Sequence, residues 1–380
     1  MQPEAKRAFE HALDCERRGD TSAALASYLN ALDHEPDDLD IAFRTATALL
    51  REGHLDEAAS QLRRIVFVDP DHIAARANLG NCQLLTGELE NAAGNFEAVL
   101  KASPDNHNAL FGLASVYLRQ QKFGEARVPA ERLLGLLPQS APALTLFAQA
   151  CARDPQSARA AAAYRQALSI DPAYYPALSG LAELSVRRKK FDEALDYVEQ
   201  ACRFAPSDAG LYRLKATALE GLGTLDAAET ALEKALSFAG LDDRPAILTA
   251  LSAICRKLGK PGEALIHAEE AWSRNPKSRE LGNALGACLK ALGKTQMAKA
   301  VLTAVARGDE LPEELVENIR SLVLEFRQER IAASAPSTDQ TLEDGISADT
   351  MPGGKASPAS EATGLVERSD ELSDEQPTGE

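Results

Sequence analysis

The sequence predicts an all-α chain built from a repeated helix pair, and three observations support that fold class. The 380 residues are 45% apolar but only 5% aromatic. Alanine and leucine, which favour helices, dominate over the β-branched runs that are typical of strands. Prolines recur at an even spacing from Pro36 to Pro206. Because a single core rarely grows past roughly 250 to 300 residues, we expect several domains or one extended array.

The proline spacing divides the chain into units of equal length. An alanine precedes each proline at one fixed distance, and a seventh copy follows after a small shift in register: Ala24/Pro36, Ala58/Pro70, Ala92/Pro104, Ala126/Pro138, Ala160/Pro172, Ala194/Pro206 and Ala264/Pro276. Alanine lets two helices approach closely, and proline cannot donate a hydrogen bond inside a helix, so it marks the restart of the next one. We therefore predict helix–turn–helix units over residues 1–310, which begin near 5, 39, 73, 107, 141, 175, 209, 245 and 279.

These units resemble the tetratricopeptide repeat family, whose repeating pattern combines Leu-Gly, Ala-x3-Phe and Pro. The third unit matches best, with Leu79, Gly80, Ala92, Phe96 and Pro104 at the family positions. Other units depart from the pattern: none has the leading tryptophan, and His11, Gly240 and Glu310 replace usual residues. The resemblance covers about four fifths of the chain. It implies a right-handed α-solenoid of about nine helix pairs.

Two irregularities interrupt the array. Pro129 falls inside the second helix of unit four, where it removes a backbone hydrogen bond at a cost on the order of 3 kcal/mol and predicts a bend. Residues 241–244 lengthen the link between units seven and eight, so we expect their stacking to be slightly offset.

The chain after residue 310 divides into two segments. Residues 311–330 predict a capping helix, because they open with Pro312 and two glutamates and then place apolar residues on one face, where they would cover the open end of the last unit. Residues 331–380 hold 11 Asp and Glu against Lys355 and Arg368, with no aromatic residue. Such a composition predicts a disordered acidic tail.

Charge and side-chain chemistry exclude several function classes. The formal net charge of -16 disfavours nucleic acid and anionic membranes as partners. The cysteines lie far apart, and no two histidines stand four residues apart, so we expect no metal site, no cofactor and no catalytic residues. The absence of a signal-peptide pattern predicts a soluble cytoplasmic protein.

The family resemblance implies that ligands bind along the first helix of each unit, at positions 2, 5, 9, 12 and 13. The candidate partner-binding residues on these helices are Phe9, Phe43, Arg44, Arg51, Asn78, Asn81, Phe111, Arg119, Arg153, Arg187, Arg213, Arg256 and Lys257. Two interpretations of the recurrent cation at position 13 stay open. It either complements the dipole at a helix end or pairs with carboxylates of an extended peptide.

The sequence thus predicts a non-catalytic scaffold or adaptor that binds one or more proteins, with acidic extended segments as one candidate ligand. An alternative is an accessory arm that recruits substrate in trans for a glycosyltransferase-like or sulfotransferase-like enzyme. A further hypothesis is contact between the tail, residues 333–380, and the chain's own basic residues. About fifty flexible residues span roughly 40 Å, which is enough to reach the cations of the later units.

Overall fold

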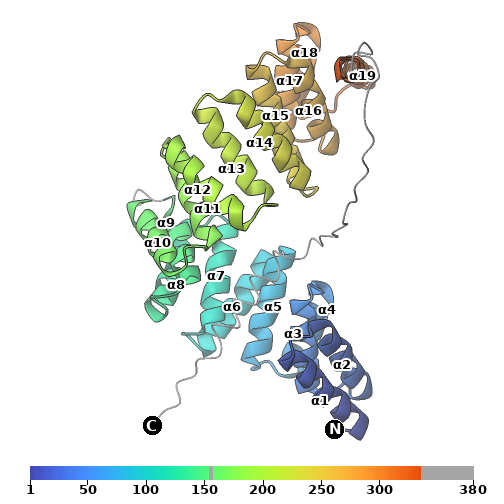
Figure 1. The fold of residues 1–380 in the computed structure, drawn as a ribbon. Helices are drawn as coiled ribbons and strands as arrows, with labels where there is room; N and C mark the ends of the chain where they lie inside the picture. Colours follow the sequence, from blue (N-terminus) through green and yellow to red (C-terminus); the bar gives the residue numbers. More distant parts are fainter. Residues whose placement is uncertain (154–156, 335–380) are drawn as a thin grey trace, which may run out of the picture. The chain divides into compact units, whose positions relative to one another are not determined.

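Nineteen α-helices make up the part of the chain that the computed structural model describes, residues 1–153 and 157–334, and that part contains no strand. The first eighteen helices form nine pairs, as the proline spacing predicted, and the all-α fold class is confirmed (Figure 1). The chain divides into two compact units, one with α1 to α10 up to Ile170 and one with α11 to α19 from Asp171 onwards. Each unit is described by itself below.

The helices of the first unit are α1 (Pro3–Arg17), α2 (Thr21–His34), α3 (Leu39–Arg51), α4 (Leu55–Val68), α5 (Ile73–Thr86), α6 (Leu89–Ala102), α7 (His107–Arg119), α8 (Phe123–Leu136), α9 (Ala141–Cys151) and α10 (Ser157–Ile170). Those of the second unit are α11 (Tyr175–Arg187), α12 (Phe191–Phe204), α13 (Ala209–Gly221), α14 (Leu225–Phe238), α15 (Arg244–Lys257), α16 (Pro261–Arg274), α17 (Arg279–Ala291), α18 (Thr295–Arg307) and α19 (Glu313–Ser334).

Short polar side chains fix where several first helices begin. The side chains of Asp38, Asn106 and Asp208 each accept a hydrogen bond from a backbone N–H of the first turn, in α3, α7 and α13. These bonds satisfy donors that have no partner within the helix. At the other end, Gly87 closes α5 with a φ of 84°, a left-handed conformation that favours glycine. Local sequence therefore sets both ends of the repeating helix.

Close packing between pairs depends on small residues at two kinds of position. The seven alanines of the proline ladder are all buried, six of them with no exposed surface. In the third pair, Phe96 is fully buried and lies against Gly80 of α5 and Gly112 of α7. A Cβ atom at Gly80 would lie 2.8 Å from the Phe96 ring, and one at Gly112 would lie closer still. The large ring occupies the space that the two glycines leave.

The two irregular sites have different outcomes. Helix α8 runs from Phe123 to Leu136 and contains Pro129 as a buried residue, so the proline does not end the helix; the expected bend stays a prediction. The segment 239–243 joins α14 to α15 and leaves Leu241 largely exposed. It is longer than the turns between the regular pairs.

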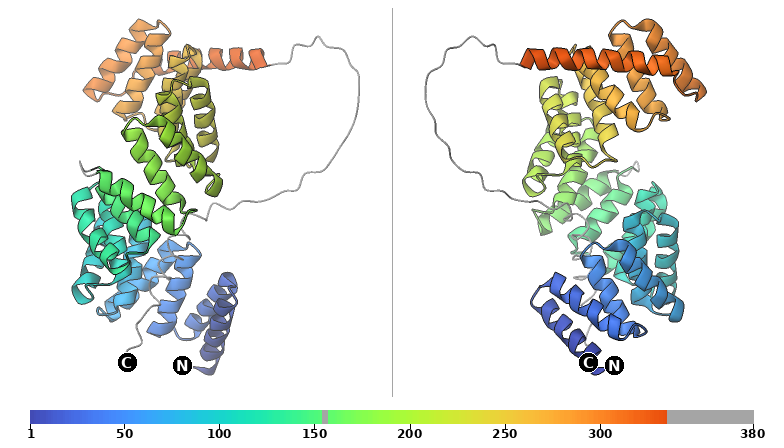
Figure 2. Two further views of the ribbon diagram at one scale, coloured as in Figure 1. Left: turned by 60° about the vertical axis from the view of Figure 1, so that its left-hand side comes forward. Right: turned by 90° about the vertical axis from the view of Figure 1, so that its right-hand side faces the viewer.

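The terminal helix lies elsewhere than the sequence suggested. We expected a cap over the last pair, but α19 packs chiefly against α16, the second helix of the eighth pair (Figure 2). Ile319 and Val323 are buried there, and the Phe326 ring lies against Gly262. Glycine at the start of α16 opens a space for that ring, which a repeat count cannot reveal. The expected disordered tail lies outside the described residues.

Candidate partner-binding face

The first helices of the first unit lie side by side, which aligns equivalent residues on one face. Helix α3 contacts α5, α5 contacts α7, and α7 contacts α9. Because each helix occupies the same place in its pair, equivalent residues of successive pairs recur along this face. We call the face formed by α3, α5 and α7 the first-helix face.

Half-buried polar side chains run across the middle of the first-helix face. Asn78 on α5 donates from Nδ2 to Thr47 Oγ1 on α3 at 3.5 Å, and Asn81 on α5 donates to Asn108 Oδ1 on α7 at 3.2 Å. All four residues are half-buried. We call Thr47, Asn78, Asn81 and Asn108 the polar strip. A side-chain amide offers two donors and one carbonyl oxygen, so one such bond leaves capacity for a ligand.

Phenylalanines lie at both ends of the polar strip. Phe43 on α3 is half-buried, and its ring centroid lies 5.0 Å from that of His72. Phe111 on α7 is half-buried as well. Phe9, the third predicted phenylalanine, packs edge-to-face on Tyr28 with centroids 5.7 Å apart and lies against the core of the first pairs. Phe43, which packs in part on the same core, and Phe111 border the strip, whereas Phe9 lies one pair earlier, on α1.

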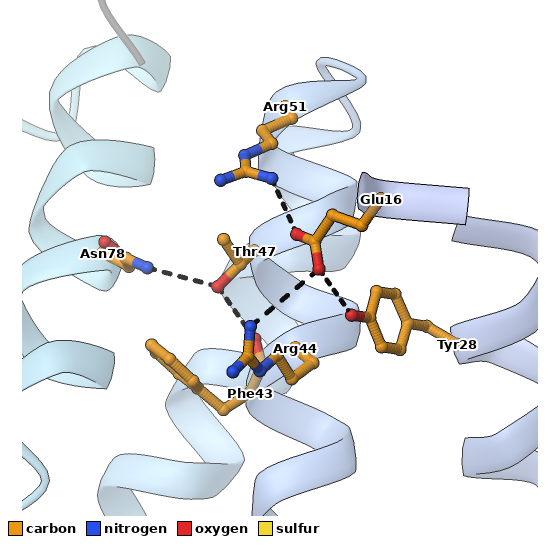
Figure 3. Close-up of polar contacts among 7 residues, drawn as sticks. All are labelled: Glu16, Tyr28, Phe43, Arg44, Thr47, Arg51 and Asn78. Carbon is orange, nitrogen blue, oxygen red and sulfur yellow. Dashed lines mark hydrogen bonds and ion pairs between the residues drawn. The ribbon is translucent and has the colours of Figure 1, made fainter. Parts of the chain in front are cut away.

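An acidic residue that sequence analysis missed organises the arginines beside the strip. Glu16 of α1 accepts a hydrogen bond from the Tyr28 hydroxyl at 2.7 Å and one from Arg51 at 2.8 Å (Figure 3). Arg44 lies 3.9 Å from the same carboxylate, and its side chain is 51% exposed against 30% for Arg51. Burial and the bond to Glu16 raise the pKa of Tyr28, so its hydroxyl remains a donor. Arg44 is the more accessible cation of this group.

The cations at position 13 connect one helix pair to the pair before it. Arg51 binds Glu16, Lys257 binds Glu220 at 2.5 Å, and Arg119 donates to the backbone oxygen of Leu84 at 2.5 Å. In all three cases the acceptor stands at position 12 of the preceding unit. Neither interpretation from the sequence included this contact. The signal was present, since a glutamate at position 12 precedes a cation at position 13 of the next unit in both ion pairs.

The remaining predicted residues fall into separate places. The Arg153 guanidinium lies over the Phe123 ring at 4.8 Å in the first unit. Arg187, Arg213 and Arg256 are exposed near or on α11, α13 and α15 of the second unit. The structure therefore brings together Phe43, Arg44, Arg51, Asn78, Asn81 and Phe111 on or beside the first-helix face of the first unit.

One group in the described chain has the side chains of a metal site. Oxygen and sulfur atoms of Glu229, Cys255 and Glu263 lie within 4.8 Å of one another. However, Lys260 Nζ lies 2.6 Å from Glu229, and the Cys255 thiol donates to the same carboxylate at 3.3 Å. Burial and the bond to Glu229 raise the pKa of Cys255 to about 12. Lys260 thus already supplies the positive charge that a metal ion would bring to Glu229, and the Cys255 thiol keeps the proton that a metal-binding cysteine loses.

Among the helices of residues 1–153 and 157–334, none combines the length and the apolar composition needed to cross a membrane.

Comparison with known proteins identifies the repeat. The tetratricopeptide repeat family matches residues 17–82, 86–141 and 152–218. No curated protein matches the chain. A tetratricopeptide repeat protein from Parabacteroides merdae shares 20% identity, with a TM-score of 0.57 over 67% of this chain and 99% of its own.

Two other solved structures show the same fold at lower identity. Cut9–Hcn1 of the APC/C shares 16% identity, with a TM-score of 0.59 over 73% of this chain and 54% of its own. A monomeric variant of IFIT1 with m7Gppp-AAAA shares 15% identity, with a TM-score of 0.56 over 87% of this chain and 83% of its own. At these identities the likeness concerns the fold alone.

Proposed function

Since the chain belongs to the tetratricopeptide repeat family, we propose that it is a non-catalytic interaction scaffold that holds an extended segment of a partner protein across α3, α5 and α7. Tetratricopeptide folds serve in general as protein–protein interaction scaffolds. The observation that carries the proposal is the polar strip, because its hydrogen-bonding side chains lie half-buried in a row between two phenylalanines.

The strip fits the backbone of an extended peptide. Peptide N–H and C=O groups need partners of both kinds, and asparagine side chains supply donors and acceptors together. Phe43 and Phe111 stand two helix pairs apart, which corresponds to roughly 20 Å at an interaxial distance of about 8–10 Å. An extended peptide rises about 3.3 Å per residue, so a segment of about six residues would reach from one phenylalanine to the other.

The same geometry suggests the side chains of the bound segment. Apolar side chains at its two ends would contact Phe43 and Phe111, which are large and half-buried. A carboxylate would pair with Arg44, whose one ion pair within the described residues is a long contact of 3.9 Å to Glu16. Arg51 contributes less to such pairing because Glu16 already binds it at 2.8 Å. We infer a partner segment with an acidic residue between two apolar ones.

A peptide-display experiment on the full chain tests this proposal. A random peptide library is panned on the protein, and the affinity of enriched peptides is measured by fluorescence anisotropy. We expect enriched peptides to contain an acidic residue flanked by apolar ones. Each of Arg44→Ala and the pair Asn78→Ala with Asn81→Ala should weaken binding about tenfold, which corresponds to about 1.4 kcal/mol.

Matched variants lie on the second helices of the same unit. Arg63→Ala on α4 and Asn91→Ala on α6 remove exposed residues of the same types and should leave the affinity unchanged. The proposal is wrong if no peptide is enriched, or if the control variants weaken binding as much as the face variants do.

A further inference from the structure

The turns that join first and second helices form one charged edge of the second unit. Helix α11 contacts α13 and α15 contacts α17, while Lys257 at the end of α15 binds Glu220 at the end of α13. The carboxyl-terminal ends of these four first helices are therefore neighbours. We call residues 187–193, 220–226, 256–263 and 290–296 the turn edge.

The turn edge is positive although the chain as a whole is strongly negative. It holds nine cations against five acids in a chain of net charge -16. The cations are Arg187, Arg188, Lys189, Lys190, Arg256, Lys257, Lys260, Lys290 and Lys294. Lysine occupies the position before the first residue of α12, α16 and α18, where the helix dipole disfavours a positive charge. The dipole favours the cations in the last turns of α11, α15 and α17, but it gives no reason for these three lysines.

Several of these cations lack an acidic partner within the described chain. Lys190, Lys257 and Lys260 form ion pairs with Glu193, Glu220 and Glu229. Across residues 1–153 and 157–334, no carboxylate pairs with the following exposed side chains: Arg187, Lys189, Arg256, Lys290 and Lys294. Five unpaired cations along one edge create a positive potential that attracts an acidic segment.

Helix α19 carries the chain towards the turn edge. Arg320 lies 3.9 Å from Glu269 in the middle of α16, and Phe326 lies against Gly262 at the start of α16. From Arg320 to Phe326 the contact therefore moves from the middle of α16 to its start, which directly follows the turn 256–260. Ser334, where the described chain ends, lies about 12 Å along the helix from Phe326. The chain that follows thus begins within reach of the turn edge.

The sequence that follows Ser334 has complementary charge and sufficient length. Residues 335–380 contain 11 acids and two cations. A flexible chain of this length has an end-to-end distance of roughly 35 to 40 Å. Helices α17 and α11 are separated by three interaxial distances, through α15 and α13, which add up to about 30 Å at 10 Å each. Even the farthest turn of the edge is within reach.

We propose that residues 335–380 bind intramolecularly along the turn edge of the second unit. The contact is electrostatic, and it covers cations that an acidic partner could otherwise use. It involves none of the residues of the first-helix face, so it stands independently of the function proposed above.

Zero-length carbodiimide cross-linking of the full chain, followed by mass spectrometry, tests the proposal. Carbodiimide joins a carboxylate to a lysine only when the two are in contact. We expect links from acids of 335–380 to Lys189, Lys190, Lys257, Lys260, Lys290 and Lys294. These links should exceed links to Lys234 and Lys277, exposed lysines of the same unit away from the edge, at least about fivefold because tethering raises the local concentration. They should disappear at about 1 M salt, where screening acts over about 3 Å.

A charge-reversal variant supplies the second measurement. Lys189→Glu, Arg256→Glu and Lys294→Glu together should reduce links to the remaining edge lysines at least about fivefold, whereas Lys234→Glu, Lys277→Glu and Arg279→Glu should not. Circular dichroism checks that both variants fold, and mixing 15N-labelled with unlabelled chains separates intramolecular from intermolecular links. Links spread evenly over all lysines, links between two chains, no links at all, or an equal effect of the control variant would each overturn the proposal.

Discussion

Arg51 of α3 donates a hydrogen bond of 2.8 Å to Glu16 of α1, far earlier in the chain, and so ties the second helix pair to the first. Lys257 and Glu220 repeat this relationship between the eighth and seventh pairs. In a solenoid each pair contacts only its neighbours, so contacts between pairs determine how the array holds together. A basic residue at position 13 that forms this contact therefore links two neighbouring pairs, and a ligand has to compete with that contact for the cation.

Removing the Glu16 carboxylate should destabilise the first unit. Glu16→Gln removes the charge that the half-buried Arg51 guanidinium contacts at 2.8 Å and weakens the acceptor of the Tyr28 hydroxyl, so we expect a loss of about 1–2 kcal/mol in the free energy of unfolding. Urea denaturation of Glu16→Gln, Arg51→Ala and the double variant measures the coupling. Additive effects of the two changes would show that the ion pair contributes nothing to stability.

Gly112→Ala should destabilise the protein by about 1–3 kcal/mol. Its Cβ atom would collide with the Phe96 ring, which is fully buried and cannot move without disturbing its neighbours. Gly94→Ala is the matched control, because Gly94 is exposed in α6 with open space around it. Alanine favours the helix there by about 0.5–1 kcal/mol. Thermal unfolding of the two variants should thus shift in opposite directions, and a shift in the same direction would contradict the packing argument.

Stability should decrease as the pH falls below 6.5 because of His267. Burial and the nearby Arg330 lower the pKa of His267 in the folded protein. The unfolded chain binds the proton at the ordinary pKa of 6.5, so it takes up more protons than the folded chain as the pH falls, and acid favours unfolding. Urea denaturation at about pH 7.5 and about pH 5.5 measures the effect. The variant His267→Gln should show a smaller decrease, and an equal decrease would assign the effect to other groups.

Docking of α19 should depend on its buried side chains. Val323 is 3% exposed against α16, whereas the adjacent Leu324 is 57% exposed. Val323→Ala should lower stability by about 1–2 kcal/mol and speed amide hydrogen exchange in α19. Leu324→Ala should leave both nearly unchanged. Hydrogen exchange that stays slow in α19 after Val323→Ala would show that other contacts hold the helix.

The repeat pattern predicted the helices because their signals are local. Pro36 and its equivalents, Ala92 and its equivalents, and the capping side chain of Asp38 each act within one pair or at one helix end. The face on which Phe43, Asn78 and Phe111 lie also follows from their position in the repeat. These features need only the periodicity of a helix and the register of the units.

Other features depend on which residues meet across pairs. Glu16 escaped notice because its partner Arg51 lies in the next pair. The site of α19 depends likewise on the space above Gly262 for Phe326. Thus the sequence by itself determined the helix pairs and their register, since proline, alanine and capping residues act locally. Only the tertiary structure decided the partner of each exposed cation and the place of the last helix, because both result from contacts between residues far apart in the chain.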